Sequence, residues 1–286
     1  MSKILTAQVA REINSVIVMH PRFKNAYDGI LQIIHLASLA ALPFGATVIA
    51  PSGCGKTALM TSIARAITND DSLSDNIRSV SVAAEANATV GHLVKKLMRE
   101  LGYPATVRAS AVYEQSSLIA SALRERGVKV LFIDEFQHVC RGKRNLSAAG
   151  ITDWIKQLAD DGGVVVILLG TRELKPLIEI NDQLSSRAPA HFELKEFDRN
   201  AEWAGLLKGL SENVKSYDLS TIHSTFQKSL HIATRGALRP LKQLLMASAG
   251  VAIEAEKSAL DKASLMIGYE RVFGPDSLAA NPFQYD

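Results

Sequence analysis

The chain has 286 residues, of which 47% are hydrophobic and 21% charged, a balance typical of a globular protein with one large domain or two modest ones. No stretch approaches the roughly 20 uninterrupted apolar residues of a membrane helix, and Arg11 and Glu12 interrupt any apolar core of a signal peptide. With two cysteines and a net charge of +3, we expect a cytoplasmic protein without disulfides or membrane partner, whose charge permits nucleic-acid binding without requiring it.

The first 40 residues are predicted to be helical, because apolar residues recur at a helical spacing. Pro21 interrupts this segment within "HPRF", since proline disfavours helix at the residue before it. Beyond it, short apolar strands alternate with helices, as is typical of an α/β domain with a mostly parallel sheet. The predicted strands are 46–50, 78–85, 128–135, 164–171 and 191–197, and the predicted helices are 57–68, 88–101, 110–126 and 148–163.

The strand pattern ends near residue 199, and several amphipathic stretches follow. They predict a small C-terminal helical lid. The last residues have too little apolar periodicity to fold alone, so we expect a tail. The predicted domains are an N-terminal helical segment 1–40, an ATPase core 41–198, the lid 199–273 and the tail 274–286.

The stretch "APSGCGKT", residues 50–57, lies between a predicted strand and a predicted helix and matches the phosphate-binding loop G-x-x-x-x-G-K-[ST], except that Ala50 replaces the first glycine. Such a loop curls backbone N–H groups around phosphate oxygens. Lys56 would place a charge on the β- and γ-phosphates of ATP, and Thr57 would ligate Mg²⁺. The predicted nucleotide contacts are Pro51, Ser52, Gly53, Cys54, Gly55, Lys56, Thr57 and Ala58.

An acidic pair ends the buried strand "VLFIDE". Asp134 is predicted to hold Mg²⁺ with Thr57, because an aspartate at a strand end beside a phosphate loop can organise the metal and its waters. Glu135 is predicted to polarise an attacking water. This pair favours hydrolysis over phosphoryl transfer to a small molecule.

In this order, "PSGCGKT", "VLFIDE", "LLGT" and a helical lid resemble the AAA+ ATPases. Within them the chain resembles the TniB/TnsC family of transposition ATPases. That resemblance rests on "HPRF", "FIDEFQHV", "VVVILLGT" before "LIEINDQLSSRA", and "NPF" near the C-terminus. It covers roughly residues 15 to 283.

The resemblance implies roles for three more residues. Thr171 falls where a polar sensor reads the γ-phosphate, and Arg187 where an arginine finger reaches the nucleotide of a neighbouring subunit. Arg239 falls at the second sensor arginine, at the start of a lid helix. A cation supplied by a neighbour would make hydrolysis depend on assembly.

The resemblance also implies that the protein polymerises on double-stranded DNA with ATP, as a ring or helical filament, and presents a target to a transposase. Such a protein should contact phosphates rather than read bases. The predicted DNA contacts lie in two places: the loop residues Thr106, Arg108 and Ser110, and the basic cluster Arg141, Lys143 and Arg144. A third candidate is the pair Lys95 and Lys96.

The function expected is therefore an ATP-dependent, DNA-binding regulator of transposition. It would oligomerise on target DNA, recruit a transposase or target-selector protein, and disassemble upon ATP hydrolysis. Two alternatives stay open: an AAA+ ATPase of a secretion or signalling apparatus without a DNA role, and a scaffold that holds ATP without turnover. A small-molecule kinase is less favoured, because the chain lacks an obvious acceptor pocket.

Overall fold

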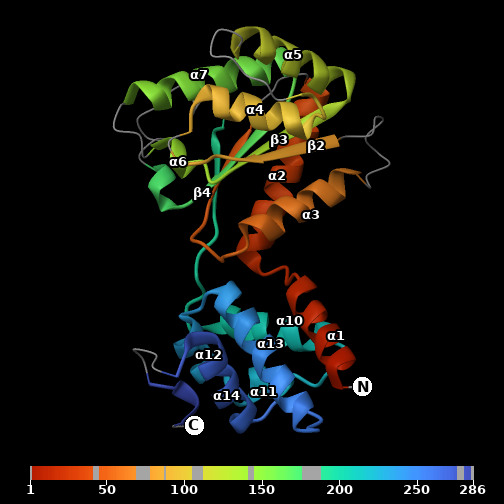
Figure 1. Ribbon diagram of the computed structural model, residues 1–286, viewed down its shortest axis with the longest axis vertical. Coiled ribbons are helices and arrows are strands. Elements are labelled where there is room, and N and C mark those ends of the chain that lie inside the picture. The colour runs from red at the N-terminus through yellow and green to blue at the C-terminus, as the bar shows by residue number, and fades with distance from the viewer. Residues whose placement is uncertain are drawn as a thin grey trace. The chain divides into compact units, whose positions relative to one another are not determined.

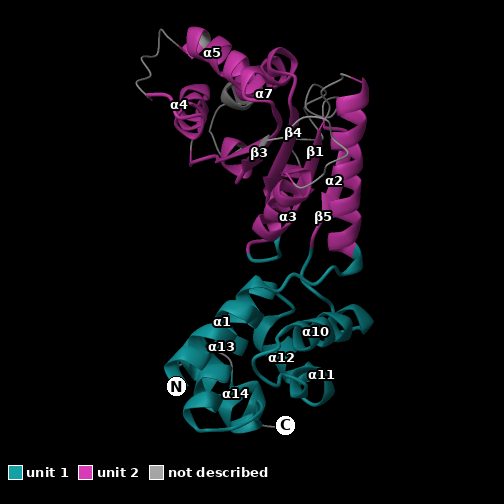
Figure 2. Ribbon diagram, turned by 90° about the vertical axis from the view of Figure 1, so that its right-hand side faces the viewer, with its two compact units in different colours: residues 1–21, 53–55, 195–286 teal, residues 22–52, 56–194 magenta. Residues whose placement is uncertain are grey.

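The computed structural model describes residues 2–40, 45–68, 78–86, 88–104, 112–140, 145–175, 188–275 and 280–284. Contacts divide the chain into two compact units, which Figure 2 colours separately. The sheet unit comprises residues 22–52 and 56–194, and the helical unit comprises residues 1–21, 53–55 and 195–286.

The strands that the structure describes form one parallel sheet in the order β2-β3-β4-β1-β5. They are β1 (Ala46–Ile49), β2 (Arg78–Ala83), β3 (Val128–Asp134), β4 (Val165–Gly170) and β5 (Ala190–Glu193). All positions of β1 and β4 are buried, as expected for central strands covered on both faces. In the register, Ile49 pairs with Gly170, so β1 and β4 end side by side.

Helices cover both faces of the sheet (Figures 1 and 2). On one face lie α4 (Val90–Glu100), α5 (Val112–Glu125) and α7 (Asn145–Gly162), and on the other lie α2 (Pro21–Ala40) and α3 (Lys56–Thr68). The apolar residues of α4, α5 and α7 share one core with β3 and β4. A short helix, α6 (Gln137–Cys140), and a 3₁₀ turn, η2 (Arg172–Leu174), follow β3 and β4 at the carboxyl edge of the sheet.

The helical unit is built around a second apolar core that includes the fully buried Trp203. Its elements are α1 (Ser2–Ser15), α10 (Ala201–Asn213), α11 (Thr221–Ser224), α12 (Gln227–Thr234), α13 (Leu238–Glu254), α14 (Lys262–Phe273) and η3 (Pro282–Gln284). The indole N–H of Trp203 donates to the Gln227 carbonyl over 2.9 Å, which satisfies the buried polar end of this ring. Among the described helices, none is long and apolar enough to cross a membrane.

The units divide the chain differently from the domains expected from sequence. The N-terminal helical segment 1–40 is split at Pro21, because Val9 and Ile13 of α1 belong to the core of the helical unit whereas α2 belongs to the sheet unit. The expected tail also differs. Phe283 is fully buried in the same core, and the Asn281 side chain donates to the Met266 carbonyl over 3.0 Å.

Glu12 of α1 joins that helix to the loop after α10. Its carboxylate accepts hydrogen bonds from the side chain and backbone N–H of Ser216 and from the backbone N–H of Lys215. These bonds lower the pKa of Glu12 from 4.5 to about 2, and the bond from the Ser216 hydroxyl has the largest effect. Because the folded pKa is depressed, the stabilisation is complete above the unfolded value and is lost as pH falls toward the folded one.

We therefore expect Glu12→Gln to lower the free energy of unfolding at pH 7 by about 0.5–1 kcal/mol, a small effect because Glu12 is only half-buried and solvent screens its charge. The difference from wild type should shrink between about pH 5 and pH 3. Chemical denaturation at several pH values measures it, with Glu125→Gln, an exposed residue of α5, as control. A difference that stays constant over this range would contradict the assignment.

Candidate phosphate site at the carboxyl edge of the sheet

The loop after β1 has the backbone conformation of a phosphate cradle. Gly53 and Gly55 adopt φ angles of 82° and 99°, a left-handed region in which side chains are disfavoured. The loop leads directly into α3, which begins at Lys56. Because the first N–H groups of a helix lack partners within the helix and carry partial positive charge, this junction suits an anion.

Lys56 is buried at the base of the loop. Only 6% of the residue is exposed, and its ammonium donates a hydrogen bond to the Ala50 carbonyl over 3.0 Å. Lysines are seldom buried without a paired charge. A buried ammonium beside the start of a helix would suit an incoming polyphosphate, and the phosphate contact of Lys56 stays a prediction.

The other predicted loop contacts differ in exposure. Cys54 is buried, so its thiol packs inward, whereas Ser52 and Thr57 are exposed and Pro51 and Ala58 are half-buried. Thr57 thus has a solvent-accessible hydroxyl in the first turn of α3.

Arg239, at the start of α13, contacts the same loop within the helical unit. Its backbone N–H donates to the Gly53 carbonyl over 3.1 Å. A Cβ added to Gly53 would lie 2.9 Å from the Cβ of Arg239. Both the φ angle and this close approach therefore require glycine at position 53. The contact brings together two residues that the sequence predicted as nucleotide contacts.

Asp134 and Glu135 lie where β3 ends. The Asp134 carboxylate accepts the backbone N–H of Glu135 over 2.7 Å. Burial raises the pKa of Asp134, and the charge of Glu135 raises it further, while the Glu135 N–H and the Lys56 ammonium oppose the shift. Asp134 therefore lies within electrostatic range of Lys56, as the sequence prediction of a shared phosphate and metal site requires.

Thr57 and Asp134 suit an Mg²⁺ ion that is bound together with a nucleotide better than one whose ligands all come from the protein. Among the described residues, no cluster of three or more histidines, cysteines or acids could hold a metal. Mg²⁺ bound with a nucleotide usually takes one or two protein ligands and completes its shell with phosphate oxygens and water. Thr57 and Asp134 would be these ligands, and the metal would neutralise phosphate charge.

Thr171 follows β4 at the same edge. Its hydroxyl oxygen is buried and has no hydrogen-bond partner among the described residues. Its backbone N–H donates to the side-chain oxygen of Gln137 over 3.1 Å. Gln137 was not among the site residues predicted from sequence; the signal available was a polar residue two positions beyond Glu135, just after the end of β3.

The remaining predicted site residues lie outside the described residues. These are the arginine finger Arg187 and the six predicted DNA contacts Thr106, Arg108, Ser110, Arg141, Lys143 and Arg144.

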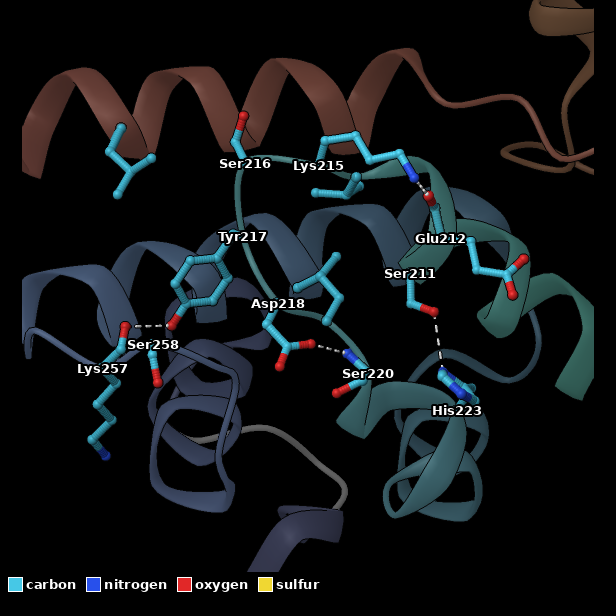
Figure 3. Close-up of a pocket in the computed structure, with 13 residues that line it drawn as sticks. Ser211, Glu212, Lys215, Ser216, Tyr217, Asp218, Ser220, His223, Lys257 and Ser258 are labelled. Atoms are coloured by element: carbon cyan, nitrogen blue, oxygen red, sulfur yellow. Dashed lines mark hydrogen bonds between the residues drawn. The ribbon is translucent and has the colours of Figure 1, made fainter.

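A second hollow, of about 650 Å³, lies in the helical unit (Figure 3). Its polar groups already bond one another. The Tyr217 hydroxyl donates to the Lys257 carbonyl over 2.9 Å, and the side chains of Ser211 and His223 lie 3.0 Å apart. These hydrogen bonds pair polar groups of the helical unit with one another.

Because its pKa is raised, the charged form of Asp134 should lower the stability of the fold even though Mg²⁺-dependent nucleotide binding would need it. A carboxyl whose folded pKa lies above its unfolded value of 3.8 destabilises the fold once pH rises above that value. We expect Asp134→Asn, measured without nucleotide at pH 7, to raise Tm by about 2 °C and to weaken Mg²⁺-dependent nucleotide binding. The gain should vanish as pH falls toward 4.

Differential scanning fluorimetry and nucleotide titration with and without Mg²⁺ measure both effects. Asp153→Asn, an exposed substitution in α7, is the control. A lower Tm at pH 7 with unchanged binding would contradict the assignment.

Comparison with known proteins gives the chain a family. The sequence profile of the family described as bacterial TniB protein matches residues 12–199, which include the phosphate loop, the acidic pair and Thr171. A comparison with curated proteins finds no match.

Solved structures share the fold at low identity. One is the ORC2 protein of Aeropyrum pernix, solved as ADPNP-ADP complexes, with a TM-score of 0.69 at 13% identity. The match covers 96% of this chain and 74% of the ORC2 chain. The ORC1 protein of Aeropyrum pernix, in complex with DNA, has a TM-score of 0.67 at 15% identity, with 90% and 66% covered. Cdc6p from Pyrobaculum aerophilum has a TM-score of 0.62 at 15% identity, with 91% and 70% covered.

At these identities the likeness shows the fold alone, which is that of the AAA+ P-loop NTPases and confirms the predicted fold class. The family profile covers well over half of the chain. The protein therefore belongs to the TniB family of bacterial proteins and has the AAA+ fold.

Proposed function

We propose that the protein is an ATP-hydrolysing regulator of transposition that assembles on double-stranded DNA in its ATP-bound form. The observation that carries this proposal is the constellation of Lys56, Asp134 and Thr171 at one sheet edge in a chain of the TniB family. A buried ammonium, a carboxylate and a buried hydroxyl converge where the β- and γ-phosphates of ATP would lie.

The chemistry follows from these positions. Lys56 and the N–H groups of the loop would bind the phosphates, and Asp134 and Thr57 would hold the Mg²⁺ that neutralises them. Glu135 would orient and polarise the attacking water. Thr171 would contact the γ-phosphate, and loss of that phosphate would be sensed there.

Assembly would complete the site. Arg187 of a neighbouring subunit would stabilise the charge that develops in the transition state, so that hydrolysis would be fast only in a ring or filament. ATP would then favour assembly and hydrolysis would favour release, because a ligand shifts an equilibrium toward the state that binds it more tightly.

DNA would be held through its phosphates by Thr106, Arg108 and Ser110 and by Arg141, Lys143 and Arg144, which follow the catalytic acids in sequence. On the described surface, Lys96 is a weaker candidate, since its ammonium already bonds Glu85 over 2.8 Å and the Ala83 carbonyl over 2.7 Å. Lys95 keeps an exposed position on α4. A transposase or target selector would be recruited by the assembled form.

The test is co-sedimentation with double-stranded DNA, together with electron microscopy, in ATP, a slowly hydrolysed analogue or ADP. We expect rings or filaments on DNA only with a triphosphate, and at least a ten-fold loss of DNA-bound protein in Lys56→Ala. Lys208→Ala, which removes an exposed lysine of α10, is the matched control. Binding should fall steeply with salt.

A triple substitution of Arg141, Lys143 and Arg144 to alanine, combined with Arg108→Ala, then tests the DNA face. ATP affinity should be unchanged and DNA binding lost. Absence of DNA binding by wild type in every nucleotide state at low salt would overturn the DNA role and favour an ATPase of a secretion or signalling complex.

A further inference from the structure

Gln137 occupies an unusual position for a polar side chain. It is the first residue of α6, two residues beyond Glu135, and is only 3% exposed. A buried primary amide is costly unless its donors and acceptor find partners. Gln137 finds them in two residues of the proposed catalytic site.

The two ends of the amide bind different partners. The nitrogen Nε2 donates to the Oε2 oxygen of Glu135, and the oxygen Oε1 accepts the backbone N–H of Thr171 over 3.1 Å. A carboxylate can only accept and a backbone N–H can only donate, so these partners fix which way the amide points. The side chain therefore links the end of β3 to the end of β4.

The backbone at the ends of β3 and β4 lies close to the Gln137 side chain. A Cβ added to Gly170 would lie 2.8 Å from Oε1 of Gln137 and 3.4 Å from its backbone nitrogen, so any larger residue at position 170 would displace the amide. The backbone N–H of Phe136 donates to the Leu169 carbonyl over 2.9 Å, which brings the two strand ends together.

Glu135 needs such a restraint. Its φ angle is 54°, a left-handed conformation that is unfavourable for a residue with a side chain. Its side chain is 41% exposed, so solvent alone would leave the carboxylate free to rotate. Its other near neighbour, the imidazole of His138, lies 3.9 Å from Oε2, beyond hydrogen-bonding distance.

We propose that Gln137 is a positioning residue that fixes the Glu135 carboxylate relative to Thr171, and so relative to the γ-phosphate. This rests on the proposed ATPase function and deepens it. A displacement of the Thr171 backbone would be passed through the amide to the base that activates water. Gln137 itself touches no reacting atom in this account; it acts by holding Glu135.

The test compares steady-state ATP hydrolysis of wild type, Gln137→Met and Gln137→Glu, with nucleotide affinity measured separately by a fluorescent ATP analogue. Methionine keeps the side-chain length and removes both hydrogen bonds. Glutamate keeps an acceptor for Thr171 and loses the donor to Glu135. Gln157→Met, an exposed substitution in α7, is the matched control.

We expect kcat to fall about 10- to 100-fold in both Gln137 variants, with KM and nucleotide affinity changed less than about two-fold and no change in Gln157→Met. A merely structural role would lower affinity and thermal stability together. Equal kcat in wild type and Gln137→Met would overturn the positioning role while leaving the ATPase function intact. No turnover by wild type, with or without DNA, would instead overturn the proposed function.

Discussion

The parallel register of β1, β3 and β4 is the constraint on which the site depends. Because parallel strands end at one edge of a sheet, the loop at Ala50, the carboxylate of Asp134 and the hydroxyl of Thr171 meet although they are far apart in sequence. The same register places Gly170 opposite Ile49. The order of strands thus brings to one edge the groups that we propose bind phosphate, hold Mg²⁺ and sense the nucleotide.

Several residues at this edge of the sheet are held in states that are energetically unfavourable for the folded protein. Lys56 is buried, and among the described residues its ammonium donates to the neutral Ala50 carbonyl; burial also disfavours the charged form of Asp134. Glu135 holds a left-handed backbone. Such unfavourable features persist where function selects for them, since the surrounding fold can offset a few kcal/mol.

Local sequence patterns were sufficient for the central strands β3 and β4 and for the phosphate loop, whereas the last strand, expected at 191–197, is observed at Ala190–Glu193. Apolar runs ending in "IDE" and "LGT" predicted buried parallel strands whose observed limits differ from the expected ones by a residue or two, and the glycine spacing predicted the phosphate loop. These features are local: strand burial depends on a short run of residue types, and the loop depends on φ angles that only glycine adopts readily.

Features that depend on tertiary contact could not be predicted in this way. Helical periodicity indicates that Val9 and Ile30 are buried, but not that they are buried in different units. Phe283 lies in a short segment with too few apolar residues to show a helical period, so no periodicity indicates its burial in the helical core. Gln137 gains its role only because β4 brings Thr171 within reach, and its spacing from Glu135 alone carries no such information.

The central claim, that this edge of the sheet hydrolyses ATP through Glu135, is tested most directly by comparing wild type and Glu135→Gln in turnover and in ATP affinity. We expect the substitution to reduce hydrolysis at least 100-fold while ATP still binds, so that the ATP-bound state accumulates. Hydrolysis at the wild-type rate in Glu135→Gln would contradict it.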